Sequence, residues 1–299
     1  MIATLHLDTG REMRGGQWQA FYLVEQLAAA GHRATLLARP GSPLLGRALE
    51  KGLDARPLRL REFLKLAPSF DLVHAHDARS HTLASLLPRP FVVSRRVAFP
   101  VRGSAASRWK YSRPSRYIAV SNYVKRMLAG SGIAEDKIDV VYDGIPLPPA
   151  PRFSARKTIV AIDSDDPGKG KSLIEDAARK AQINVLFSKN LTADLNGAAL
   201  FVYISDSEGL GSAVLLAMAA GVPVLASAVG GLPEIVEAGV TGLLTGNSSE
   251  QIADGMLRMM ADEALRERLG RSGRARVEQA FTTEHMMRNT VRLYEKVLA

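Results

Sequence analysis

The sequence predicts an α/β protein of two domains, each built on a parallel β-sheet. Short runs of β-forming residues alternate with helical patterns, which is typical of parallel strands joined by helical crossovers. Near the middle, the stretch DGIPLPPAPRFSARK (143–157) contains prolines that break both helix and strand, and the alternation begins again after it. With 299 residues, of which 46% are apolar, the chain can bury two hydrophobic cores.

The first domain is expected to span residues 1–150. Its first long helix should run from Gln17 to Ala30, because apolar residues recur there at helical spacing and Gly31 follows at the expected cap position. Its β-type runs are at 2–7, 33–38, 71–76, 91–94, 117–120 and 139–142.

The second domain is expected to span residues 151–280, with a final helix at 281–299 that packs back towards the first domain. Strands are predicted at 158–162, 184–187, 199–204 and 223–227, and helices at 171–181 and 212–220. The uncharged stretch 209–233 is long enough to cross a membrane, but its glycines and Pro223 would interrupt a spanning helix. It therefore predicts helix, turn, strand and turn.

Composition excludes several classes of chemistry. The chain has no cysteine, so disulfides, thiolate metal sites and cysteine nucleophiles are excluded. Asp8 and Arg11 interrupt the opening stretch, which therefore does not resemble a secretory signal. We expect a cytoplasmic location, with a peripheral position on the inner face of the membrane as an extension of that expectation.

Positive charge is concentrated in the first domain. Residues 1–150 hold 22 Lys and Arg against 12 Asp and Glu, and no acid occurs between Ala78 and Ala134. The segment is either a solvated basic face or a surface for an anionic membrane, a phosphorylated acceptor or nucleic acid. No recognition-helix or RNA-binding motif accompanies it, so nucleic acid is not expected as a partner. Arg95, Arg96 and Arg102 are the candidate acceptor-binding residues.

Four short motifs place polar or glycine residues where parallel strands end. Gly15 and Gly16 precede the first long helix, where backbone amides attract anions, although paired glycines often only turn a chain. His76 ends the run DLVHAHD, a position that a structural histidine could equally occupy. The stretch SDDPGKGKS resembles a phosphate-binding loop, but Asp165 replaces its first glycine, so nucleotide hydrolysis is not favoured and Lys169 or Lys171 remains as a loop cation.

The fourth motif, SDSEGLGS, places Glu208 before the glycines at 209 and 211, with Ser212 expected to cap the following helix. An acid near a helix N-terminus can simply stabilise the helix, by about 0.3–1 kcal/mol. The alternative is a binding role for the carboxylate. Position alone does not separate the two.

Together these segments resemble the retaining, nucleotide-sugar-dependent glycosyltransferases of the group 1 (family 4) type. The resemblance rests on RGGQWQAFYLVEQLAAAGHRATLLA, DLVHAHD, RYIAVSNYVKRML, KIDVVYDGI, SDSEGLGSAVLLAMAAGVPVLASAVGGLPEIVEAGVTGLL and FTTEHMMRNTVRLYEKVLA. It implies the GT-B fold, in which two Rossmann-like domains have parallel sheets that face a central cleft. No metal and no cofactor other than a nucleotide-sugar co-substrate are expected.

The resemblance also implies roles for individual residues. Glu208 would hold the hydroxyls of the transferred sugar, His76 would contact that sugar, and Lys169 would stabilise the departing phosphate. The remaining donor-binding positions are Gly15, Gly16, Gly209, Leu210, Gly211 and Ser212.

The chain departs from the family pattern in its second domain. Leu216 stands where a second glutamate normally binds ribose, the phosphate-binding arginine is missing, and about one βα unit is absent. The prediction is a transferase that moves a sugar, with retention, to an anionic lipid-linked acceptor such as a lipopolysaccharide core or phosphoglycolipid. The alternative is a catalytically impaired GT-B protein that binds a glycolipid or partner.

Overall fold

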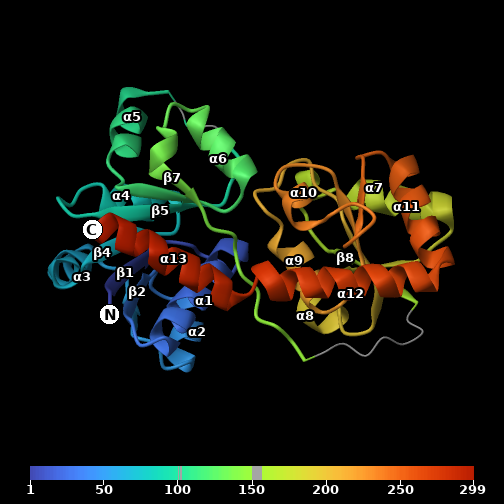
Figure 1. Cartoon of the computed structure of the whole chain (residues 1–299), viewed down its shortest axis with the longest axis horizontal. Coiled ribbons are helices and arrows are strands. Elements are labelled where there is room, and N and C mark those ends of the chain that lie inside the picture. The colour runs from blue at the N-terminus through green and yellow to red at the C-terminus, as the bar shows by residue number, and fades with distance from the viewer. Residues whose placement is uncertain (100, 102, 150–156) are drawn as a thin grey trace. The chain divides into compact units, whose positions relative to one another are not determined.

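The computed structural model describes residues 1–99, 101, 103–149 and 157–299, and the chain divides into two compact units. The N-terminal unit comprises Met1–Gly144 together with Thr283–Ala299, and the C-terminal unit comprises Ile145–Thr282 (Figure 1). The chain passes from one unit to the other at 144/145 and at 282/283, whereas the sequence predicted boundaries at 150/151 and 280/281. Arg102 and the proline-rich residues 150–156 lie outside the described residues.

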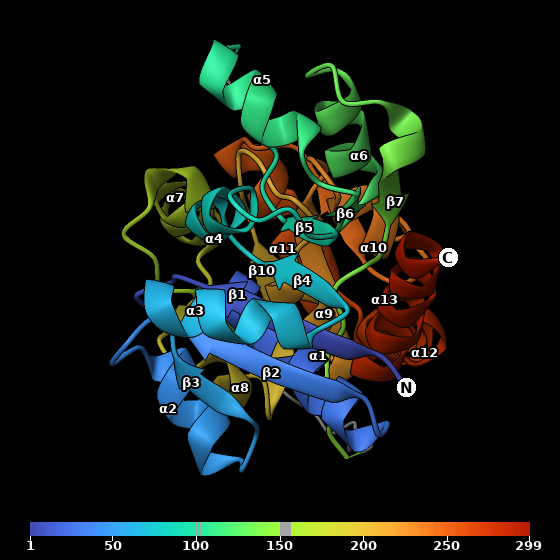
Figure 2. The same cartoon turned by 90° about the vertical axis from the view of Figure 1, so that its left-hand side faces the viewer.

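The N-terminal unit is built on a seven-stranded sheet in the order β3-β2-β1-β4-β5-β6-β7 (Figure 2). Every recorded strand pair in it is parallel. The strands are β1 Ala3–Asp8, β2 Arg33–Ala38, β3 Ala55–Pro57, β4 Leu72–Ala75, β5 Phe91–Arg95, β6 Arg116–Ala119 and β7 Ile138–Val140. The carboxyl ends of β1, β4 and β5 therefore share one edge of this sheet, where ligands of parallel sheets bind.

Seven helices surround this sheet in the described part of the unit. They are α1 Gly15–Ala29, α2 Pro43–Glu50, α3 Leu60–Leu66, α4 Ala78–Ala84, α5 Ala105–Ser112, α6 Asn122–Ala129 and α13 Thr283–Leu298. Helix α1 buries an apolar face that includes Phe21, Leu23 and Leu27. Helix α13 packs against α1 and buries Leu293 and Tyr294, so the final helix completes the core of the N-terminal unit.

The C-terminal unit is built on a five-stranded parallel sheet in the order β12-β11-β10-β8-β9. The strands are β8 Thr158–Ile162, β9 Val185–Ser188, β10 Ala198–Tyr203, β11 Val224–Ser227 and β12 Leu243–Thr245. The helices are α7 Lys171–Ala181, α8 Leu191–Asp194, α9 Ser212–Ala219, α10 Leu232–Ile235, α11 Ser249–Ala261 and α12 Glu263–Ala280. Central strand β10 is buried along its whole length, as its continuous apolar run requires.

The parallel α/β architecture predicted from the sequence is confirmed, and helix α7 occupies the predicted range 171–181. Strands β3 and β12 were not predicted, because runs of three residues carry little periodicity. Among the described residues, none of the helices combines the length and the apolarity needed to cross a membrane.

Candidate functional site

In the C-terminal unit, the carboxylate of Glu208 is held by two side chains that come from different segments. Lys169 Nζ lies 2.8 Å from Glu208 Oε2, and the hydroxyl of Tyr203 donates a hydrogen bond to the same oxygen. Lys169 Nζ also lies 3.0 Å from the Tyr203 hydroxyl, so the three groups form a closed triangle. Burial, followed by the neighbouring charge of Glu208, raises the pKa of Tyr203 well above its usual value, so the phenol keeps its proton and acts as the donor.

The loop that carries Lys169 is fixed to the end of strand β10. Residues Pro167–Lys169 form one 3-10 turn, and the carbonyl of Gly168 accepts hydrogen bonds from the hydroxyl of Ser205 and the amide of Asp206. Gly170 follows with φ +62°, and a Cβ there would lie 2.5 Å from the Ile204 side chain. Only glycine fits this position, which sets the distance between Lys169 and Glu208.

A second glycine pair supports the backbone of Glu208 from the other side. The amide of Gly231 donates to the carbonyl of Glu208 at 3.0 Å. A Cβ on Gly230 would lie 2.0 Å from that carbonyl oxygen, and one on Gly231 would lie 2.2 Å from the carbonyl oxygen of Gly209. The GG of SAVGGLPE therefore allows the close approach of two loops, a role that the sequence alone did not reveal.

The predicted cap of helix α9 is wrong by one residue. Gly211, with φ +106°, occupies the N-cap position and has no side chain to cap the helix, and Ser212 is the first residue of the helix. A left-handed glycine turns the chain tightly enough to bring Glu208 and the start of the helix together. Leu210 is buried in the core at 2% exposure, so it offers only its backbone, and Leu216 is half-buried.

In the N-terminal unit, the predicted residues Gly15, Gly16 and His76 lie at the edge formed by the ends of the strands. The two glycines begin helix α1, and a Cβ on Gly16 would lie 3.7 Å from the side chain of Arg96. Arg96 forms an ion pair with Asp143 at 3.1 Å, and its NH1 lies 3.5 Å from Nδ1 of His76. Arg96 therefore links the glycine turn to the histidine.

His76 belongs to a buried row of hydrogen bonds that fixes its tautomer. A guanidinium can only donate, so Nδ1 of His76 accepts from Arg96 and its Nε2 carries the proton. Nε2 then donates to His6 Nδ1 at 3.0 Å, and His6 Nε2 donates to the Thr4 hydroxyl at 2.9 Å. Burial, the largest cause, lowers the pKa of His76 well below its ordinary value, so the ring stays neutral.

One ring nitrogen from each of His6, His74 and His76 lies within 4.8 Å of the other two, as in a metal site. The rings of His74 and His76 are stacked with centroids 4.1 Å apart, and a metal ion lies in the plane of each imidazole that binds it. The stacked rings therefore do not converge on a shared ion. Hydrogen bonds account for His74, whose nitrogens reach Tyr294 at 2.6 Å and Ser94 at 2.8 Å.

Asp8 ends strand β1 beside the same edge and was not singled out from the sequence. Its carboxylate accepts from the amide of Gly10 at 2.7 Å and from the Gln17 side chain at 3.1 Å. Burial raises the pKa of Asp8 to about 6. The carboxyl therefore titrates near neutrality, next to the glycine turn that begins α1.

The structure places the arginines of the basic segment mostly in structural contacts. Arg95 donates to the Phe99 carbonyl at 2.5 Å and to the Tyr111 hydroxyl at 3.3 Å, and Arg96 is paired with Asp143. Arg102 lies outside the described residues. Binding of an acceptor by Arg95 and Arg96 stays a prediction, and it would require them to exchange these partners.

Two family models match the chain in succession. Glycosyltransferase Family 4 matches residues 13–147, and Glycosyl transferases group 1 matches residues 152–276. Each unit of the structure thus contains all or nearly all of the match to one of the two glycosyltransferase models.

The chain belongs to the group 1 glycosyltransferases.

Solved structures show the same fold for this glycosyltransferase. Alr3699/HepE from Anabaena, in complex with UDP and glucose, matches with a TM-score of 0.86 at 16% identity, over 99% of this chain and 100% of that chain. The fold is therefore GT-B, as predicted.

Curated relatives match this chain in sequence either over a short segment or over a long segment at lower identity. The alpha-maltose-1-phosphate synthase of Mycobacterium tuberculosis is 38% identical over 112 residues, which is 35% of this chain and 29% of that protein. The uncharacterized glycosyltransferase MJ1178 of Methanocaldococcus jannaschii is 24% identical over 268 residues, or 76% of each chain. The matched segment thus spans less than a third of the first of these relatives.

Proposed function

We propose that this protein transfers a sugar from a nucleotide sugar to an anionic, lipid-linked acceptor, such as a lipopolysaccharide core or phosphoglycolipid, with retention of configuration. The observation that carries the proposal is the triangle of Lys169, Tyr203 and Glu208 in the C-terminal unit. In this proposal the carboxylate of Glu208 holds the sugar hydroxyls and the adjacent cation of Lys169 contacts the phosphate. The complex of HepE with UDP and glucose supports a nucleotide-sugar donor.

In the proposed reaction, the acceptor hydroxyl attacks the anomeric carbon on the face that the diphosphate leaves. The bond from that carbon to the diphosphate oxygen breaks, the bond to the acceptor oxygen forms, and the acceptor proton passes to the leaving oxygen. Lys169 and the amides of the glycine turns stabilise the charge on the diphosphate, while Glu208 and His76 orient the sugar. No residue of this chain acts as a nucleophile in the scheme.

The acceptor is proposed to be anionic because the N-terminal half carries the excess of positive charge. The name of the mycobacterial relative, a maltose-1-phosphate synthase, describes a phosphate-bearing product and agrees with this class. We place the reaction at the cytoplasmic surface of a membrane, where each cation close to anionic lipid contributes about 1 kcal/mol.

A second candidate is a binding protein with an impaired donor site. Half-buried Leu216 favours it, because a leucine cannot form the charged hydrogen bond to ribose that a glutamate forms, which contributes roughly 1.5–3 kcal/mol. On this alternative, the protein would bind a glycolipid or partner without transfer.

Calorimetric titration with nucleoside diphosphates and nucleotide sugars separates the two candidates. A transferase should bind one donor with micromolar affinity, and Glu208→Gln and Lys169→Met should each weaken that binding about tenfold or more. Lys171→Met is the matched control, because Lys171 lies two residues away and pairs with Asp163 instead. If no nucleotide sugar binds, or if Glu208→Gln binds its donor as wild type does, the proposed transfer function is wrong.

A further inference from the structure

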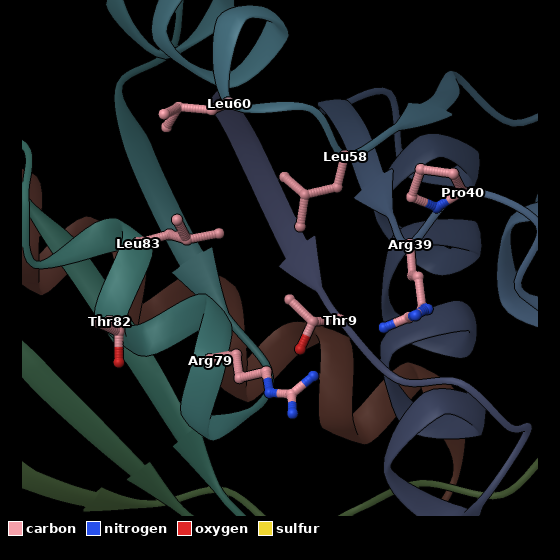
Figure 3. Close-up of a pocket in the computed structure, with 8 residues that line it drawn as sticks. All are labelled: Thr9, Arg39, Pro40, Leu58, Leu60, Arg79, Thr82 and Leu83. Carbon is pink, nitrogen blue, oxygen red and sulfur yellow. The ribbon is translucent and has the colours of Figure 1, made fainter.

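The N-terminal unit contains a pocket of about 600 Å³ that none of the predicted site residues lines. Its walls come from the residues that follow β1 and β2, the segment after β3, the start of α3, and helix α4 (Figure 3). The volume lies in the range of about 300–1,000 Å³ typical of small-molecule sites. The lining residues are Thr9, Arg39, Pro40, Leu58, Leu60, Arg79, Thr82 and Leu83.

The pocket has a cationic part and an apolar part. In Figure 3 the side chains of Leu58, Leu60 and Leu83 gather on one side, and the guanidinium groups of Arg39 and Arg79 lie on the other side, flanking Thr9. This separation suits a ligand with an anionic group at one end and a hydrocarbon chain at the other.

The two guanidinium groups are available to a ligand. Within the described residues, neither Arg39 nor Arg79 has a side-chain hydrogen bond or ion pair, unlike Arg95 and Arg96. An acid beside the pocket is Asp77, whose carboxylate accepts from the Thr9 amide and hydroxyl and from the amide of Arg79. These neutral donors occupy the carboxylate oxygens of Asp77 without cancelling its charge, which offsets at most one of the two arginine charges.

The apolar side of the pocket continues onto an exposed helix. Leu60 is 57% exposed and Leu64, one turn later in α3, is 49% exposed. Arg61 and Lys65 are exposed beside them. Paired leucines flanked by cations are typical of a surface that contacts the interface of an anionic membrane.

The pocket also adjoins the predicted sugar-contacting residue. Thr9 lines the pocket and donates to Asp77 through its amide at 2.5 Å and its hydroxyl at 2.8 Å. Asp77 directly follows His76 in the chain. A ligand in the pocket would therefore lie close to the histidine edge of the sheet.

We propose that this pocket binds a phosphate-bearing amphiphile, with the phosphate between Arg39 and Arg79 and the apolar chain along the leucines. The inference rests on the proposed function, because it assigns this ligand as the acceptor. Two arginine forks match a phosphate dianion in charge and geometry better than they match a single carboxylate. The phosphate can belong to a membrane lipid or to a free amphiphile, and the experiment distinguishes these sources.

Calorimetry with octyl phosphate, inorganic phosphate and octyl glucoside tests the pocket in the full-length protein. Octyl phosphate should bind, and the double variant Arg39→Gln/Arg79→Gln should weaken it at least tenfold. The control Lys125→Gln/Arg126→Gln removes the same charge from helix α6, which does not line the pocket, and should bind as wild type does. Leu83→Asn should weaken the binding of octyl phosphate but not the binding of inorganic phosphate. Equal binding of inorganic and octyl phosphate, or of wild type and Arg39→Gln/Arg79→Gln, would overturn the proposal.

Cosedimentation with phosphatidylcholine vesicles, with and without phosphatidic acid, identifies the source of the phosphate. If the protein binds the acidic vesicles and Arg39→Gln/Arg79→Gln does not, the phosphate belongs to a membrane lipid. If the two arginines are needed for octyl phosphate but the vesicles do not bind, the ligand is a free amphiphile. Donor titration on the same variants separates this proposal from the transfer function. The variant Arg39→Gln/Arg79→Gln should keep donor binding, whereas Glu208→Gln should weaken donor binding about tenfold or more and still bind octyl phosphate.

Discussion

At the scale of single residues, the site depends on hydroxyl and carboxyl groups whose partners lie far away in the sequence. Tyr203 shows this most clearly, because its ring stacks near Phe201 within strand β10 while its hydroxyl holds Glu208. Its hydroxyl donates to Glu208 and accepts from Lys169, so we expect the larger effect on the part of a donor that Glu208 contacts and a smaller one on the phosphates.

Tyr203→Phe is expected to weaken nucleotide-sugar binding about tenfold, because Glu208 loses a hydrogen bond to a charged group. The corresponding nucleoside diphosphate lacks the sugar that Glu208 would hold. The variant should therefore bind it with an affinity within about twofold of that of wild type. Calorimetry with both ligands gives the ratio of the two losses in affinity. Equal losses for the two ligands would contradict a positioning role and indicate general damage to the unit.

Asp8 predicts a pH dependence of stability. Its pKa is raised from 3.8 to about 6 by burial, so between these values the folded chain holds a proton that the unfolded chain has lost. The free energy of unfolding should therefore fall as pH rises from about 4 to 6, by roughly 3 kcal/mol at most. Asp8→Asn should remove this contribution.

Chemical denaturation of wild type and Asp8→Asn across this pH range measures the difference. Asp136→Asn, at an exposed position of the same unit, controls for the loss of a charge. A wild-type stability that falls no faster with pH than that of Asp8→Asn would show that Asp8 is not buried as described.

At the scale of elements, the geometry around Lys169 and Glu208, the proposed donor site, depends on loops whose glycines let their backbones approach closely. The turn before α10 touches the turn before α9 through Gly230 and Gly231, and the loop before α7 touches the end of β10 through Gly170. These contacts bring together the loops that carry Lys169 and Glu208.

Gly231→Ala should destabilise the C-terminal unit by about 1–3 kcal/mol, because the new Cβ would overlap the Gly209 carbonyl. Donor binding should weaken in parallel, since Gly209 adjoins Glu208. Gly46→Ala is the matched control, as nothing lies within 4 Å of a Cβ there and Gly46 is inside helix α2. It should stabilise the protein by about 0.5–1 kcal/mol, and thermal unfolding followed by circular dichroism compares the two.

The sequence predicted those parts of the site that lie within short local motifs. Glu208, Lys169 and Gly15 each stand where a strand meets a loop or helix, so residue type and position identified them. Tyr203 was read as a strand residue, because its contact with Glu208 depends on how β10 ends. Arg39 and Arg79 form one pocket only after β1, β2 and α4 pack together, and no periodicity encodes that.

At the scale of the whole chain, the N-terminal unit is closed by residues from the far end of the sequence. Tyr294 of α13 hydrogen bonds His74 of β4 at 2.6 Å, across 220 residues. Both residues are fully buried. The long-range link makes the last helix part of the unit that contains His76.

Tyr294→Phe should lower the stability of the N-terminal unit by about 1–3 kcal/mol, because the buried imidazole loses its partner. Both tryptophans, Trp18 and Trp109, belong to this unit, so intrinsic fluorescence reports its unfolding selectively. Tyr203→Phe lies in the other unit and should leave the fluorescence transition unchanged. An unaltered transition in Tyr294→Phe would show that the hydrogen bond to His74 contributes nothing.

The position of α13 also orders the events of biosynthesis. A ribosome makes residues 1–144 first, but the apolar surface that α13 covers stays open until residues 283–298 have emerged. The C-terminal unit is one continuous segment of the chain, so it can finish folding while the N-terminal unit still lacks α13. The half of the chain that is translated first is therefore completed last, and during that interval its uncovered face is the part of the nascent protein that most needs protection from aggregation.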